Sequence, residues 1–181
     1  MPAYVRRSGK RSPPLAAGTV RTLATRMLSG LGLERAELSV LLTDDATIRE
    51  LNRQWRQQDK PTDVLAFPID ERAGRAAHER SSDALRDTRR GGGKDLILGD
   101  VVISLETAAH QARSRRRELS EEGRFLLAQG LLHLIGFDHA DAEEKREMVA
   151  ATRRLVKAAA APTTSKPPPA TPRRPRKSRS A

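Results

Sequence analysis

The residues best suited to do chemistry lie close together in the last third of the chain. Gln129 and His133 are four residues apart, so on a helix they share one face. Gly136 allows that helix to end in the left-handed conformation, and the chain can then turn so that Asp138 and His139 swing back towards the same face. Two imidazoles and a third ligand around a helix end are typical of an open divalent-metal site.

Such a site predicts hydrolytic chemistry. Three protein ligands and one water are what a catalytic zinc needs, and the metal would lower the pKa of that water and polarise a phosphoryl oxygen. The alternative is that the two histidines only satisfy terminal carbonyls or interact with the helix dipole. The segment is not the HExxH motif of metalloproteases, because Gly130 stands where that motif has its glutamate base.

The elements that must position these residues follow from hydrophobic periodicity. Three strands are expected, at 37–43, 63–67 and 96–104, the last with a bulge at Gly99. Five helices are expected, at about 15–30, 45–55, 105–117, 120–136 and 141–157. This mixed order predicts an α+β fold, a small mixed β-sheet packed with about five helices in a single metalloprotease-like domain.

Composition divides the chain into a body and three atypical segments. The body spans 13–160 and contains a long surface loop at 70–95, which ends in three consecutive glycines. Residues 1–12 are predicted to be a flexible basic N-terminus. Residues 161–181 are rich in Pro, Arg and Lys, have no large apolar side chain and are predicted to be disordered.

The excess positive charge lies at the two ends of the chain. Residues 1–12 carry four basic side chains and residues 157–181 carry seven, with no acidic ones, which accounts for the whole net charge of +11. The basic tail is therefore expected to bind a polyanion with a steep salt dependence. The arginines at 115–117 are expected mainly to complement a helix dipole. Trp55 and Phe67 are expected in the core rather than as stacking platforms for bases.

Several protein classes are excluded by what the sequence lacks. There is no cysteine, so disulfides, thiolate metal sites and cysteine nucleophiles are ruled out. No apolar run approaches the roughly 18 residues of a membrane span, and the N-terminus has no apolar segment typical of a secretory signal. We therefore expect a soluble, cytoplasmic protein with no membrane partner.

Three segments resemble the YbeY family of bacterial rRNA-maturation endoribonucleases. Residues 129–139 fit ten of the eleven positions of the family signature H-G-x-L-H-L-x-G-[FY]-D-H. Residues 52–67 resemble the family's N-x3-R-x2-D-x-P-T-D-V-L-S-F block, and residues 98–104 resemble its L-G-D-I-V-I-S strand. The three blocks come in the family's order and place the resemblance at about 45–145.

The resemblance implies an α+β metalloprotein with one zinc ion held by three histidines, of which His133 and His139 take the second and third places. It implies single-strand-specific RNA cleavage, 16S rRNA 3′-end maturation and ribosome quality control. The partners implied are rRNA and the small ribosomal subunit, with ribosomal proteins or an assembly GTPase as further ones. Arg56 takes the place of the family's active-site arginine, and its planar fork suits phosphate oxygens. The alternative is a structural salt bridge to Asp59 or Asp63.

Gln129 departs from the family pattern, because it replaces the first histidine ligand. A neutral amide oxygen is a poorer zinc donor than imidazole. Gln129 or a water could complete a weaker site, or another side chain such as Asp138, Asp141 or His110 could substitute. A further alternative is that the metal site is empty. The protein would then be a ribosome-associated RNA- or protein-binding factor with little or no hydrolysis.

Overall fold

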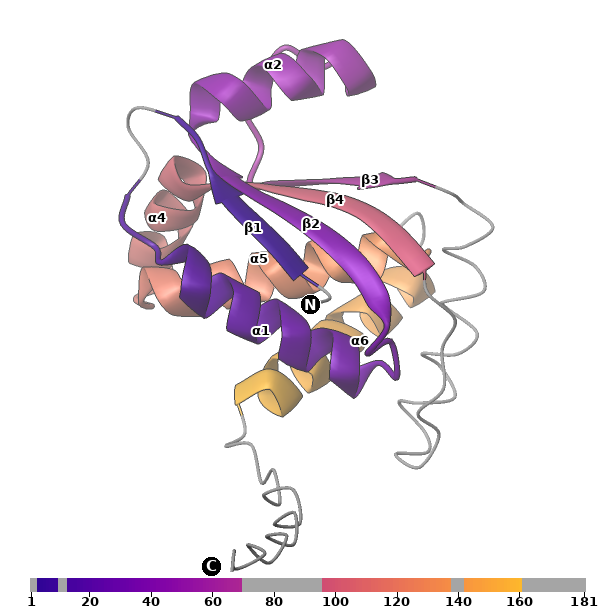
Figure 1. The fold of residues 1–181 in the computed structure, drawn as a ribbon. Helices are drawn as coiled ribbons and strands as arrows, with labels where there is room; N and C mark the ends of the chain where they lie inside the picture. Colours follow the sequence, from indigo (N-terminus) through magenta and orange to yellow (C-terminus); the bar gives the residue numbers. More distant parts are fainter. Residues whose placement is uncertain (1–2, 10–12, 70–95, 138–141, 161–181) are drawn as a thin grey trace, which may run out of the picture.

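The computed structural model describes residues 3–9, 13–69, 96–137 and 142–160. Four strands form one sheet in the order β1-β2-β4-β3 (Figure 1). These strands are β1 (Ala3–Arg7), β2 (Ala36–Thr43), β3 (Val64–Pro68) and β4 (Leu96–Ser104). The first three in this order are parallel, and β3 is antiparallel to β4. The described helices are α1 (Ala17–Gly30), α2 (Asp45–Arg56), α4 (Leu105–Ser114), α5 (Leu119–Leu134) and α6 (Ala142–Ala160).

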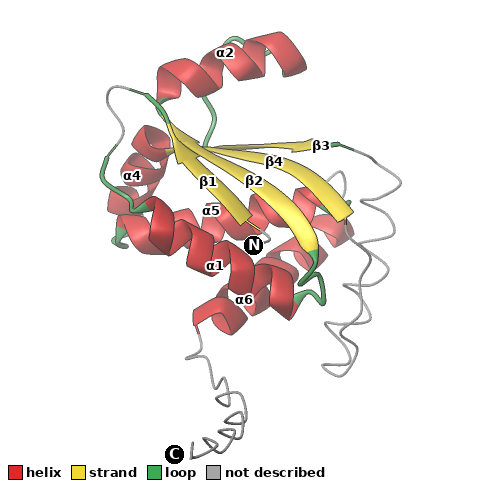
Figure 2. Cartoon of the chain, viewed as in Figure 1, coloured by secondary structure: helices red, strands yellow, loops and turns green. Residues whose placement is uncertain are grey.

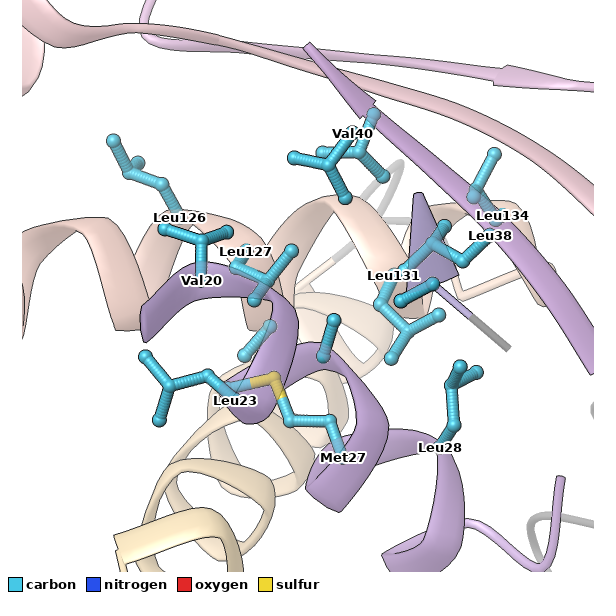
Figure 3. Close-up of a cluster of buried hydrophobic side chains, with 14 of the residues drawn as sticks. Val20, Leu23, Met27, Leu28, Leu38, Val40, Leu126, Leu127, Leu131 and Leu134 are labelled. Carbon is cyan, nitrogen blue, oxygen red and sulfur yellow. The ribbon is translucent and has the colours of Figure 1, made fainter. Parts of the chain in front are cut away.

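The main core lies between one face of the sheet and the helices α1, α5 and α6 (Figure 2). Side chains on β2 alternate in burial, and Leu38, Val40 and Leu42 point into this core. Figure 3 shows Leu38 and Val40 of β2 on the side of the sheet that faces Leu131 and the other buried leucines of α5. Burying a side chain of this size is worth about 1.5–3 kcal/mol, so this layer supplies most of the stability. The predicted α+β class is confirmed.

The opposite face of the sheet is only partly covered, by α2. Ile48 of α2 packs there on Leu65 and Val102, with Phe67 partly buried at the margin. Trp55 follows on the same helix but is 64% exposed, and its ring meets Phe67 edge-on at a centroid distance of 6.2 Å. The prediction of Trp55 in the core is wrong, because a single helix does not cover this face.

The strand β1 was not expected. It pairs in parallel with β2, and Ala3 and Val5 enter the core while Tyr4 and the two arginines after Val5 are exposed. The prediction of a flexible N-terminus is therefore wrong for residues 3–7. The alternation has only two buried positions, which is too short a pattern to predict a strand. The predicted segments 70–95 and 161–181 lie outside the described residues.

The bulge predicted at Gly99 is confirmed. The register between β2 and β4 shifts so that Glu37 faces Ile97 and Leu38 faces Gly99. Gly99 has a φ of +135°, and a Cβ there would lie 2.1 Å from the carbonyl oxygen of Phe67. Only glycine therefore allows β3 to pair with β4 at this position. No helix in the described ranges is long and apolar enough to cross a membrane.

Candidate functional site

The candidate site is built on α5, a helix that is buried on most of its sides. Its N-cap is Glu118, whose side chain forms a capping box with Glu121. Leucines at 126, 127, 131, 132 and 134 are all buried. Gln129 and His133 are half-buried and lie one turn apart, as the spacing predicts. They are therefore polar groups at the margin of an otherwise apolar helix.

Gly130 explains how closely this helix approaches the sheet. A Cβ at Gly130 would lie 2.5 Å from the Cγ1 of Val101 and 3.1 Å from the Cγ2 of Val64, closer than van der Waals contact allows. Position 130 thus faces β3 and β4. A glutamate here, as in HExxH, would have to enter the packed layer, so the absence of that base has a steric cause.

The turn after α5 fixes the orientation of His133. The amide of Phe137 donates to the carbonyl of Leu132 and the amide of Gly136 donates to that of His133, both at 3.0 Å, with Gly136 at a φ of +90°. This is the Schellman arrangement, and it confirms the predicted left-handed end of the helix.

The reversed chain returns the carbonyl of Phe137 to within 3.0 Å of His133 Nδ1. A carbonyl oxygen only accepts, so Nδ1 carries the proton and the imidazole lone pair is on Nε2. Metal-binding histidines are oriented in the same way by a carbonyl or carboxylate. The imidazole of His133 is therefore in a tautomer that can bind a metal through Nε2.

The rest of the predicted ligand set is only partly described. Asp138, His139 and Asp141 lie outside the described residues, so their roles stay predictions. Within the described ranges, no three His, Cys, Asp or Glu side chains are grouped to hold a metal. The donors present at the end of α5 are the His133 imidazole and the Gln129 amide. His110, the other substitute considered, is exposed on α4.

Arg56 ends α2 and is exposed. Neither predicted salt-bridge partner binds it. Asp59 accepts two hydrogen bonds from Arg49, at 2.8 and 2.9 Å, and this contact lowers the pKa of the Asp59 carboxyl. Asp63 accepts from the side chain of Gln111 and from the amide of Val64, both at 2.9 Å. The salt-bridge alternative is therefore wrong, and no ion pair within the described ranges holds the Arg56 guanidinium.

Much of the 52–67 block serves to build the connection between α2 and β3. The buried side chain of Asn52 donates to the carbonyl of Lys60 at 2.8 Å, and the Arg49–Asp59 pair ties the loop to the helix. Gln57 takes a left-handed conformation at the end of α2, where the chain turns back. These contacts hold Arg56 at the start of a fixed loop.

Arg56 and His133 come from opposite sides of the sheet. In Figure 1, α2 lies over one face and α5 under the other, with the edge strand β3 between them. The two side chains are therefore not packed against each other. Within the described residues, β3 is the edge strand that separates the two side chains.

The fold belongs to an α+β class that has a member among solved structures. A solution structure of a Thermotoga maritima protein has this fold, with a TM-score of 0.55 and 21% identity, over 86% of this chain and 89% of that one. The family model "Endoribonuclease YbeY" matches residues 12–160. The chain belongs to the YbeY family.

Curated relatives carry the same description. "Endoribonuclease YbeY" of Anaeromyxobacter dehalogenans is 46% identical over 133 residues, or 74% of this chain and 59% of the relative. That of Persephonella marina is 41% identical over 130 residues, or 72% of this chain and 74% of the relative. That of Aquifex aeolicus is 46% identical over 120 residues, or 66% of this chain and 67% of the relative. The matched part thus spans about three fifths of the length of the Anaeromyxobacter relative.

Proposed function

We propose that the protein is a metal-dependent, single-strand-specific endoribonuclease that acts in maturation of the 16S rRNA 3′ end and in ribosome quality control. The observation that carries the proposal is the end of α5, where His133 is held by the Phe137 carbonyl in the tautomer that binds metal. Membership of a family whose relatives are named endoribonucleases supports the reaction class.

The proposed cofactor is one zinc ion, held by His133, His139 and, more weakly, Gln129. His133 presents Nε2, and Gln129 lies one turn earlier on the same side of α5. Zinc bound there would lower the pKa of a coordinated water and polarise a phosphoryl oxygen. The chain's own residues would position the metal. His133 would fix the place of the site, and the absence of a side chain at Gly130 lets α5 pack closely against the sheet.

In the proposed reaction, Arg56 binds the phosphate at which the strand is cut. Its guanidinium is exposed, stays charged and carries donors that match two phosphate oxygens. Since Arg56 and His133 flank opposite faces at the β3 edge, the RNA strand would run along that edge to meet both. An unpaired strand can follow such a path more easily than a stiff duplex.

The proposed partners follow from the substrate. They are rRNA within the small ribosomal subunit, together with ribosomal proteins or an assembly GTPase. The proposed location is the cytoplasm, which the absence of cysteine fits.

The Arg56→Ala substitution tests the proposed reaction. We expect kcat for a single-stranded RNA to fall roughly 100-fold, because a charged donor aimed at the reacting phosphate is lost. The control is Arg53→Ala. Arg53 is an exposed arginine on the same helix, and its ion-pair partner is Glu50. Equal activity of the two variants, at unchanged metal content, would show that Arg56 has no part in cleavage.

The Gln129→His substitution tests the metal proposal. Replacing an amide by an imidazole should tighten zinc binding by roughly 10- to 100-fold. Elemental mass spectrometry after dialysis against metal-free buffer gives the zinc content of both chains. About one zinc per chain in the natural protein supports the proposal. If only the variant holds zinc and cleaves RNA, the natural protein is the binding factor without hydrolysis.

A further inference from the structure

A positively charged surface lies between α5 and α6, separate from the proposed metal site at His133. It is a hollow of about 490 Å³ beside the start of α5 and the end of α6. We call it the basic groove. Its cationic lining consists of Arg115, Arg117, Arg124, Arg153 and Lys157.

The acidic side chains at the basic groove are already engaged. Glu122 is fully buried beneath it and binds Arg115, while Arg117 Nη1 lies 3.8 Å from its other oxygen. Glu121 accepts from the amide of Glu118 in the capping box. Two of the three arginines at the end of α4, Arg115 and Arg117, therefore also contact a buried carboxylate.

Three cations of the basic groove have no anionic partner in the described part of the chain: Arg124, Arg153 and Lys157. Arg153 and Lys157 are exposed and one turn apart on α6, so both face the same side. The Nε of Arg124 is buried and has no hydrogen-bond acceptor among the described residues. A buried donor without an acceptor is uncommon, and a bound water or an anion seated in the basic groove would satisfy it.

We propose that the basic groove binds backbone phosphates of the RNA substrate, at a place separate from the cleavage site. Phosphates suit it because they supply both the negative charge and the oxygen acceptors that these side chains lack. Arg124 and His133 are nine residues apart on α5, which places them about 14 Å apart along the helix axis. The inference rests on the proposed function, since it assigns part of the binding of the same substrate.

Two contact regions on one helix make recognition depend on RNA length. A strand of about 20 nucleotides can reach both regions, whereas one of about two nucleotides, which spans only about 7 Å at the stacked spacing of about 3.4 Å, can occupy only the cleavage site. The basic groove should therefore raise affinity for long substrates more than for short ones.

The test is the double variant Arg153→Ala/Lys157→Ala in the full chain. We expect Kd for a 20-nucleotide single strand to rise about tenfold, and the slope of log K against log salt to fall by about 1.4, or about 0.7 for each lost phosphate contact. The ratio of kcat/KM between the long and the short substrate should fall by a similar factor. The matched control is Arg21→Ala/Arg154→Ala, which removes the same charge from exposed positions of α1 and α6 outside the basic groove.

The outcomes separate this inference from the proposed function. If the natural chain cleaves RNA but the groove variant keeps its Kd and salt slope, the basic groove does not bind RNA, and an acidic protein segment becomes the better partner. If both double variants weaken binding equally, only net charge matters and the inference is overturned. If the natural chain neither binds nor cleaves RNA, the proposed function itself fails.

Discussion

The His133→Ala substitution is expected to remove the metal and to lower kcat for single-stranded RNA roughly a thousandfold. His133 is the imidazole that the end of α5 orients, and without it the described part of the site offers only the Gln129 amide. The effect should exceed that of Gln129→Ala, because Gln129 is already a poor donor. The measurements are zinc content by elemental mass spectrometry and initial rates on single-stranded RNA.

The control for this prediction is His110→Ala. His110 is an exposed histidine on α4, so its removal changes composition without changing the end of α5. The His133 variant also loses the contact with the Phe137 carbonyl, which should cost only about 1 kcal/mol of stability. A His133 variant that keeps its zinc and its activity while remaining folded would rule out His133 as a metal ligand.

The local parts of the structure could be predicted from the sequence. The turn after α5 depends on residues 132–137, so Gly136 and the helical spacing were enough to predict it. The bulge at Gly99 was equally local, as a single glycine within an apolar strand indicates it. Both features depend on residues that are only a few positions apart in the chain, so the local sequence is enough to predict them.

The parts that depend on distant neighbours could not be predicted. Trp55 looks like a core residue until the sheet face beside it proves to have only one covering helix. Arg56 has two carboxylates close in sequence, but Arg49 and Gln111 bind them instead. Glu122 reads as a polar residue in the first turn of α5, and only the packed structure shows it buried under Arg115. Each of these outcomes is decided by tertiary contacts that override local pattern.

The close approach of α5 to the sheet at Gly130 leads to a second large effect, in the Gly130→Ala variant. Alanine normally stabilises a helix by about 0.5–1 kcal/mol relative to glycine. Here the added methyl group would lie 2.5 Å from Val101 Cγ1, so α5 must move away from β4. Overpacking of this kind costs about 1–3 kcal/mol, which outweighs the gain in helix propensity. We expect a lower Tm and, because Gln129 is the adjacent residue, weaker zinc binding.

The matched control is Gly18→Ala in α1, because nothing lies within 4 Å of a Cβ at that position. This variant should raise the free energy of unfolding by up to about 1 kcal/mol, so the two substitutions are expected to have opposite signs. Adding Val101→Ala to the Gly130 variant makes room for the new methyl group and should recover part of the zinc affinity as well as the helix position. If stability recovers but zinc affinity does not, the Gly130 contact supports the core without positioning the site. If Gly130→Ala stabilises the protein as Gly18→Ala does, α5 does not pack closely enough on the sheet for a methyl group at position 130 to clash with Val101.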